Sequence, residues 1–399
     1  MNKPLLFIFL TIFIDVTGLG IIIPVLPDLI RELTHSDLST ASKYAGWIAA
    51  SFSVMMFICS PIMGGLSDRY GRRPVLLLSL LGFGLDYILQ GLAQTIVWLF
   101  IGRLIAGMFG ASYSTAAAYI ADVSSADKKA QNFGLIGAAF GLGFILGPAL
   151  GAVLGQYGLR IPFFGSAFLA LLNLIFGFFV LPESLKLENR RAFDWKRANP
   201  VGTLKVLFRY PALSGFVIIL FLTYVAHYSL QSTWSFYTMK KFSWDHTMVG
   251  YSLAFVGLMM AIVQGGLTRV IIPKLGNRRS IYTGMCFAIF GYLAYAFAPT
   301  SLSMFIIIIP FAMSGLASPA IQAIITNQVP ANAQGELQGG LGSLLSLTAI
   351  VGPLLMTQVF NFFTRDQSPV YFPGAPFLLA FVLVSTATML LVKPLSKLS

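Results

Sequence analysis

Charged residues are scarce in this sequence. Asp, Glu, Lys and Arg make up only 10% of the 399 residues, whereas a soluble domain carries about 25%. Hydrophobic residues make up 57%, which is more than one globular core can bury, so most of the surface must face lipid. The scarcity of charge therefore excludes a soluble globular protein.

Acids, histidines and cysteines are few in number. The chain has 14 acids, three histidines and two cysteines. Cys59 and Cys286 both fall inside apolar runs, which predicts buried thiols rather than a disulfide or metal ligands. The loops contain no metal-ligand spacing, no phosphate-binding glycine loop with a lysine and no nucleophile triad. We therefore expect no enzyme activity, no bound metal or cofactor, and no ATP-driven transport.

Long apolar runs occupy most of the chain. A membrane-spanning helix needs about 20 apolar residues, and the length fits twelve such helices. The first run holds Asp15 and lacks a small-residue cleavage site, so we expect a retained helix rather than a signal peptide. The fold class is thus an all-α polytopic membrane protein with spans at 5–29, 44–67, 75–93, 97–121, 132–155, 162–181, 212–236, 247–271, 280–298, 302–325, 336–362 and 375–393.

Basic residues between the spans predict the topology. They produce the net charge of +12, and their position in short loops indicates orientation rather than a nucleic-acid patch. With a cytoplasmic N-terminus, 19 Lys and Arg residues lie in inner segments and 6 in outer ones. Both termini are therefore expected in the cytoplasm. The basic segment 183–211, a plain tether or an amphipathic surface stretch, would link a six-helix bundle at 1–182 to another at 212–399.

The two halves look like repeats. Six landmarks recur at one offset of 205 residues, and two parallel six-helix halves with a site between them are a known plan for transporters. The repeat is unequal, because nothing in the second copy corresponds to the acid Asp68. The landmark pairs are Gly71 and Gly276, Arg73 and Arg278, Gly134 and Gly339, Gly137 and Gly342, Gly147 and Gly352, and Pro148 and Pro353.

The loop at 64–74 is the most specific motif. It reads Gly-Gly-Leu-Ser-Asp-Arg-Tyr-Gly-Arg-Arg-Pro, with one acid and three arginines in six residues. It resembles the loop between helices 2 and 3 of the major facilitator superfamily, roughly G-x-L-x-D-R-x-G-R-R. The resemblance implies a cytoplasmic gate between helices, to which an acid at the inner end of helix 4 contributes. The expected gate residues are Asp68, Arg69, Gly71, Arg72, Arg73 and Asp122.

Three charged residues fall inside expected spans: Asp15, Asp86 and Arg103. An intramembrane charge is costly, so its default interpretation is functional, although an ion pair kept only for folding is the alternative. The surroundings of Asp15 resemble the first-helix signature of drug/proton antiporters. Those of Asp86 resemble the tetracycline/proton antiporters, and those of Arg103 the fourth-helix motif of the superfamily. The resemblance ties Arg103 to proton movement and Asp86 to binding of the drug with its chelated divalent cation. We expect all three residues to serve proton coupling, with Asp15 as the partner of Arg103.

A run of glycines marks the fifth span. Glycine falls on nearly every turn, which permits close helix packing. The run resembles a signature of antiporters rather than symporters, although general helix packing would also explain it. Its expected packing residues are Gly137, Gly141, Gly147, Pro148 and Gly151.

Polar and aromatic side chains within the spans are candidates for a substrate site. With 35 phenylalanines and 15 tyrosines, the chain suits a flat amphipathic substrate. Met260 and Ala288 stand where the tetracycline family has polar residues, so the implied coupling rests on the first half. The expected substrate-binding residues are Asp86, Tyr113, Phe140, His227, Tyr228, Gln231, Gln264 and Gln322, of which His227 and Gln231 share a helix face.

These features predict a proton-coupled antiporter of the bacterial inner membrane. It would export a small amphipathic, tetracycline-like compound by alternating access, as a monomer and without a nucleic-acid partner. The proton gradient would drive export, and any divalent cation would arrive chelated by the substrate. Two alternatives stay open: a proton symporter for a metabolite or siderophore-like solute, and a lipid or lysolipid flippase. The direction of substrate flux and an assay of lipid scrambling would discriminate among them.

Overall fold

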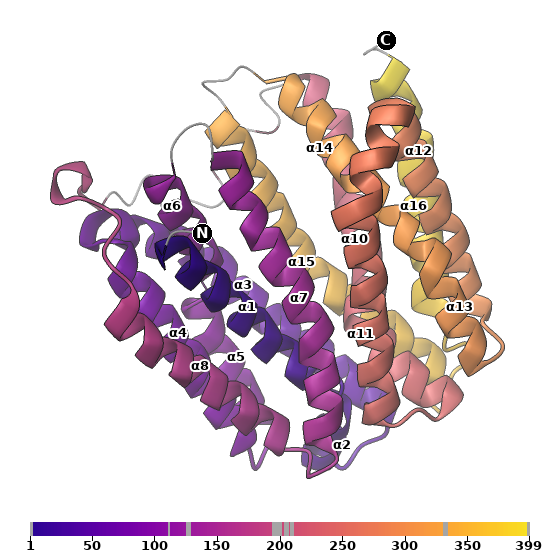
Figure 1. The fold of residues 1–399 in the computed structure, drawn as a ribbon. Helices are drawn as coiled ribbons and strands as arrows, with labels where there is room; N and C mark the ends of the chain where they lie inside the picture. Colours follow the sequence, from indigo (N-terminus) through magenta and orange to yellow (C-terminus); the bar gives the residue numbers. More distant parts are fainter. Residues whose placement is uncertain are drawn as a thin grey trace. The chain divides into compact units, whose positions relative to one another are not determined.

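The computed structural model describes residues 3–110, 112–124, 129–193, 202, 207, 211–329 and 334–396, and these residues form helices and no β-strand. The helices gather into two compact units (Figure 1). Unit 1 comprises Met1–Ser36, Ser51–Asn199 and Asp245–Ala254, and unit 2 comprises Asp37–Ala50, Pro200–Trp244 and Phe255–Ser399. Most of the expected linker, 194–210 apart from residues 202 and 207, lies outside the described residues. The boundaries at 182 and 211 stay predictions.

Eight α-helices lie in the first half of the sequence. The third is shared between the units, because its first turns belong to unit 2. The helices are α1 (Lys3–Ile22), α2 (Leu26–Thr34), α3 (Leu38–Tyr70), α4 (Arg72–Gly91), α5 (Ile96–Met108), α6 (Ser112–Val123), α7 (Lys129–Gly155) and α8 (Ile161–Val180), followed by the 3₁₀ turn η1 (Leu187–Asn189).

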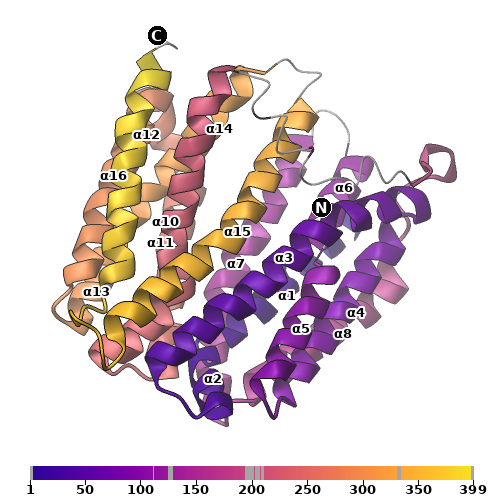
Figure 2. The ribbon, with the colours of Figure 1, turned by 180° about the vertical axis from the view of Figure 1, so that it is seen from behind.

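The described helices of the second half run from Pro211 onward (Figure 2). Helix α11 is divided between the units, and a π-helical turn, η3, follows it. The elements are α10 (Pro211–Phe242), α11 (His246–Ile262), η3 (Val263–Leu267), α12 (Thr268–Phe297), α13 (Ser301–Ala312), the 3₁₀ turn η4 (Met313–Leu316), α14 (Ala317–Asn327), α15 (Gln334–Thr364) and α16 (Ala375–Ser396).

Twelve membrane-spanning segments follow from these helices. In the described part of the chain, ten helices are long and apolar enough to cross a membrane. One of them, His246–Phe297, holds two spans, because Gly276 adopts φ +76° and breaks the helix within it. The short helices α5 and α6 together make one more. The chain is thus an all-α membrane protein with twelve spans.

Two expected spans and one expected loop differ from the helices in detail. The span expected at 5–29 ends at Ile22, because Pro24 lacks a backbone N–H and the chain turns at 23–25 before α2. The span expected at 97–121 is interrupted after Met108, where the N–H of Gly110 bonds to the Gly107 carbonyl. Between the eighth and ninth expected spans, helix continues up to the break at Gly276 where a loop was expected.

Within unit 1, helix α1 packs along α7 and α8, and α4 packs against α8 and α5 (Figure 1). Helices α1 and α7 meet almost backbone to backbone: a Cβ added at Gly147 would lie 2.7 Å from the Thr17 carbonyl oxygen, and one at Gly20 would lie 3.0 Å from the Gly147 Cα. Only glycine permits this approach. The contact therefore fixes α1, the helix that carries Asp15, against α7.

The expected pseudo-symmetry of the two halves is present. Gly71 and Gly276, which are 205 residues apart, both have positive φ, at +110° and +76°. Pro148 and Pro353 lie inside α7 and α15, and α10 packs against α15 in unit 2 as α1 packs against α7 in unit 1 (Figure 2). The two halves are therefore six-helix bundles built on one plan.

Candidate functional site

A buried ion pair lies at the centre of unit 1. Arg103 on α5 donates from Nη2 to Oδ2 of Asp86 on α4. Gln90, one turn after Asp86, donates from Nε2 to the other carboxylate oxygen, Oδ1, at 2.8 Å. The exposed fractions of Asp86, Gln90 and Arg103 are 0%, 1% and 8%. Both oxygens of the acid are thus occupied by donors in a site that excludes water.

Helix geometry explains why these side chains meet. Asp86 and Gln90 are four residues apart, so they lie on the same face of α4. Next to Arg103, Gly102 presents no side chain, and a Cβ there would lie 2.5 Å from Asp86 Oδ1. The carboxylate consequently rests against the bare backbone of α5, within reach of Arg103.

Aromatic rings complete the surroundings of Arg103. Its guanidinium carbon lies 5.6 Å from the centre of the Phe52 ring and 5.9 Å from that of Tyr87. Such stacking stabilises a cation where water is absent. The Nε atom of Arg103 is buried and has no hydrogen-bond partner among the residues described. Arg103 is therefore held by one carboxylate and two rings.

The expected pairing of Arg103 with Asp15 is corrected by this arrangement, because Arg103 forms its ion pair with Asp86. The physical reason is that α4 and α5 pack together and bring the two side chains face to face. Asp15 is half-buried on α1 and lies within electrostatic range of the Tyr87 hydroxyl. A Cβ on Gly18, one turn after Asp15, would lie 3.4 Å from that hydroxyl. Tyr87 thus interacts with Asp15 through its hydroxyl and lies near Arg103 through its ring.

A second charged cluster lies at the Gly71 end of unit 1. Arg72 donates from Nη1 to Asp68 at 2.6 Å and to the Ser67 hydroxyl at 3.0 Å, and from Nε to Asp122 at 3.2 Å. The hydroxyl of Ser184, which follows α8, also donates to Asp122 at 3.0 Å. Arg72 therefore ties the end of α3 to the end of α6, which brings together three of the expected gate residues.

The other two arginines of the loop point elsewhere. The guanidinium of Arg69 lies over the ring of Tyr70, at 5.1 Å from its centre. Arg73 donates to the carbonyl of Phe178 on α8 at 2.6 Å and lies over its ring. Among the three arginines of the loop, Arg72 thus forms the ion pairs with Asp68 and Asp122, whereas Arg73 contacts α8.

Glu183 is the member of the cluster that sequence analysis missed. Its carboxylate accepts the backbone N–H groups of Arg72 and Arg73, the first two residues of α4, at 2.8 and 3.2 Å, and that of Leu185 at 3.0 Å. A carboxylate at a helix N-terminus satisfies unpaired N–H groups and complements the helix dipole. A Cβ on Gly71 would collide with Glu183, so the glycine also makes room for this cap. The order Pro-Glu after an apolar span was the available signal.

The glycine run of α7 divides into two groups. A Cβ on Gly151 would collide with the Ile21 carbonyl of α1, and Gly147 and Pro148 also lie against α1. A Cβ on Gly137 or Gly141 would meet no atom within 4 Å. The close approach to α1 thus belongs to the C-terminal part of the run.

The expected substrate residues of unit 2 fall on separate elements. On α10, His227 and Tyr228 are half-buried and Gln231 is exposed, and the Tyr228 ring packs against Gly352 of α15. Gln264 lies in the π-turn η3, where its side chain packs against Gly315. Gln322 on α14 donates to Gln338 on α15 at 3.2 Å.

The remaining candidates are placed as follows. Phe140 is exposed on α7, and the side chain of Tyr113 lies outside the described residues. Met260 is half-buried and Ala288 is buried, so neither supplies a polar group. Among the residues the structure describes, no group of three or more His, Cys, Asp or Glu side chains could hold a metal ion.

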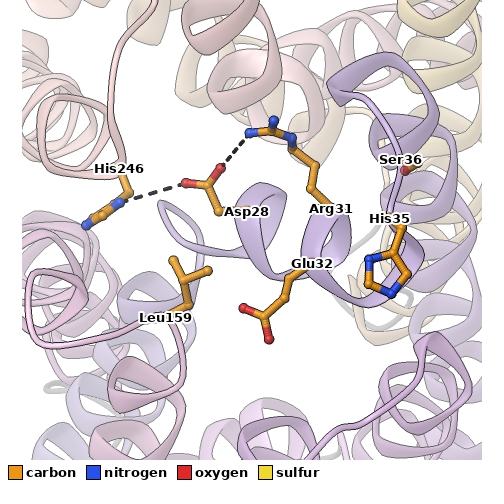
Figure 3. A pocket seen from close by; sticks show the side chains of 7 residues that line it. All are labelled: Asp28, Arg31, Glu32, His35, Ser36, Leu159 and His246. Carbon is orange, nitrogen blue, oxygen red and sulfur yellow. Dashed lines mark hydrogen bonds and ion pairs between the residues drawn. The ribbon is translucent and has the colours of Figure 1, made fainter.

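A pocket lies at the other end of unit 1, around helix α2. Its volume is about 490 Å³, and Figure 3 shows Asp28 between Arg31 and His246. Asp28 lies 3.3 Å from Arg31 Nη1 and 3.8 Å from His246 Nδ1. Arg160 donates to Glu32 at 2.8 Å. The lining residues are Asp28, Arg31, Glu32, His35, Ser36, Leu159 and His246.

Comparison with known proteins agrees with this architecture. The chain matches the Major Facilitator Superfamily over residues 8–353. It is 38% identical over 359 residues to the class C tetracycline resistance protein of Escherichia coli, with 90% of both chains covered, and 34% identical over 387 residues to the class H protein of Pasteurella multocida, with 96% of this chain and 94% of the relative covered. The crystal structure of the human organic anion transporter MFSD10 superposes with a TM-score of 0.69 at 25% identity, covering 96% of this chain and 99% of that one. The chain therefore belongs to the major facilitator superfamily, with tetracycline resistance proteins as relatives along nearly its whole length.

Proposed function

We propose that this protein is a proton-coupled antiporter that exports a small amphipathic compound of the tetracycline kind. The observation that carries the proposal is the similarity to tetracycline resistance proteins over about nine-tenths of the chain. The buried pair of Asp86 and Arg103 supports it, because an ionisable pair inside a membrane protein marks a proton or substrate pathway. Transport proceeds by alternating access of the monomer.

Competition for an acidic site is the simplest coupling. Substrate favours the ionised carboxylate of Asp86 or Asp15, and a proton arriving from outside displaces it. Arg103 contributes to the coupling because it neutralises the negative charge of Asp86, which exists only while that acid is ionised. The protein needs no cofactor of its own, and a divalent cation belongs to the substrate that chelates it. Asp86 of unit 1 belongs to the proposed substrate site.

The membrane and the orientation belong to the same proposal. The protein lies in a bacterial inner membrane with both termini in the cytoplasm, and the bias of 19 inner to 6 outer basic residues supports this orientation. The cluster of Asp68, Arg72, Asp122 and Glu183 then lies on the cytoplasmic side. There it acts as a gate whose ion pairs close in one state and separate in the other.

Substrate-induced proton release from the purified protein tests this function. Tetracycline, a fluoroquinolone and a cationic dye are added to weakly buffered protein, and wild type is compared with Asp15→Asn and Asp86→Asn. We expect release with tetracycline that is lost in at least one variant. No release with any compound overturns the proposal. In proteoliposomes, tetracycline uptake in the same direction as protons identifies a symporter, and lipid scrambling identifies a flippase.

A further inference from the structure

The hydrogen bond from Gln90 to Asp86 has no place in the coupling described above. Arg103 already neutralises the acid at Oδ2, yet an amide occupies Oδ1 at 2.8 Å in a site from which water is excluded. A hydrogen bond to a charged group in such a site is stronger than one at the surface. The amide must therefore affect how readily Asp86 takes up a proton.

We propose that Gln90 is a positioning residue that sets the pH at which Asp86 exchanges its proton. The inference rests on the proposed antiport, since Asp86 is taken there as a coupling acid. An amide Nε2–H stabilises the ionised carboxylate and fixes its orientation toward Arg103. With Gln90 in place, Asp86 keeps its charge to a lower pH than the pair with Arg103 alone would allow.

Three features tie this role to Gln90. The amide and the acid lie one turn apart on α4, so no other helix has to move for the bond to form. Gly102 has no side chain, so Asp86 Oδ1 can lie against α5. Among the described residues, the amide of Gln90 is the donor to that oxygen. The Gln90 side chain makes no other hydrogen bond to a described residue, so its amide serves Asp86 alone.

Unit 1 also offers a matched control. Asn173 on α8 is a buried amide of the same chemistry, but its partners are the hydroxyl and the carbonyl of Thr11 on α1. Asn173→Leu therefore removes a buried amide without touching a charged group. A general loss of packing or of a buried hydrogen bond will appear in both Gln90 and Asn173 variants, whereas an effect on Asp86 will appear only in those of Gln90.

The experiment is a titration of Asp86 by infrared difference spectroscopy on the full-length protein in detergent. The carbonyl band of protonated Asp86 is identified by its absence in Asp86→Asn. In Gln90→Met, which keeps the length of the side chain and removes the donor, we expect the midpoint to rise by about one pH unit, a tenfold change in proton affinity. In Asn173→Leu we expect the wild-type midpoint. An unchanged midpoint in Gln90→Met, with a fall in melting temperature equal to that of Asn173→Leu, overturns the proposal.

A second variant covers the case in which Gln90→Met does not fold. Gln90→Glu preserves size and polarity and places two carboxyl groups together, so the proton is shared and we expect two titration steps in place of one. A single step at the wild-type midpoint also contradicts the role of Gln90. Because the titration needs no substrate, its result is separate from that of proton release. A shifted midpoint without substrate-induced release rejects the antiport function and keeps the assignment of Gln90 to Asp86.

Discussion

Arg103 and Asp86 form a buried ion pair between consecutive helices, 17 residues apart in sequence. The pair joins α4 to α5 within one bundle, so it exists without any contribution from the second half of the chain. Desolvation makes such a pair expensive to break from one side only, because the remaining partner stays charged without compensation. The stability of unit 1 therefore depends on both side chains of this pair.

Removing one partner of this pair will destabilise the protein more than removing both. We expect Asp86→Asn to cost about 3 kcal/mol, because Arg103 is then buried without its carboxylate. The double variant Asp86→Asn/Arg103→Gln will recover part of that loss. Thermal unfolding in detergent compares wild type, the single variants Asp86→Asn and Arg103→Gln, and the double variant. Strictly additive losses in the double variant would show that the two charges do not interact.

Gly102→Ala will disturb the site from the side of α5. The new methyl group meets Asp86 Oδ1 at 2.5 Å, so the carboxylate must shift, at an expected cost of about 1–3 kcal/mol. The control is Gly137→Ala, at a helical position with no atom within 4 Å, where alanine is expected to stabilise by up to about 1 kcal/mol. Equal melting temperatures for the two variants would contradict this account of Gly102.

Glu183→Gln will weaken the start of α4. The variant keeps the size of the side chain and loses the charge that interacts with two backbone N–H groups and the helix dipole. We expect a loss of about 1 kcal/mol in the free energy of unfolding. Glu188→Gln, which removes an acid 73% exposed in a loose pair with Lys186, should change stability by less than half as much. An equal effect of both variants would argue against the cap.

The cluster at the Gly71 end gives a prediction about transport. If Arg72 closes the proposed gate through Asp68 and Asp122, Asp68→Asn will remove the shorter of the two ion pairs and slow exchange about tenfold while the protein stays folded. Tetracycline exchange in proteoliposomes measures the rate, and thermal unfolding checks the fold. Asp68→Asn with a wild-type rate would remove the cluster from the mechanism.

Asp37, at the start of the first segment of unit 2, will make the stability of the protein depend on pH. Burial raises the pKa of its carboxyl, but hydrogen bonds from Thr40 and Ser39 outweigh that effect and lower the pKa to about 2. Since the pKa is lower in the folded state than in the unfolded chain, the stabilisation is present above about pH 4 and is lost as pH falls toward 2. Asp37→Asn should flatten the melting temperature between pH 4 and 2, whereas an equally steep profile would assign the effect to other acids.

The sequence predicted the helices well because lipid enforces long apolar runs and leaves no other way to satisfy the backbone. The residues at which the helices end were predicted less accurately. The break at Gly276 needs a positive φ, which a glycine permits but does not require. The basic residues Lys274, Arg278 and Arg279 indicated a loop, yet helix continues on both sides of the break. The stop at Ile22 was visible in Pro24, but the apolar run through Leu29 masked it.

The partner of Arg103 shows why a site is harder to predict than a fold. Position along an apolar run gives the depth of a residue in the membrane, and by that measure Asp15 and Asp86 were equal candidates. The choice depends on which way each side chain faces around its helix axis, which is set by helix packing. Gln90 could have been found, because the four-residue spacing that grouped His227 with Gln231 applies equally to Asp86 and Gln90.

The cap that Glu183 places on α4 has a consequence for biosynthesis. The residues that it joins are 110 and 111 positions apart, so the ribosome must complete the sixth span before the carboxylate exists. Until then the first N–H groups of α4 lack this partner, and the loop at Gly71 is held from one side only. The N-terminus of α4 therefore gains this cap only after the last helix of the first bundle has been synthesised.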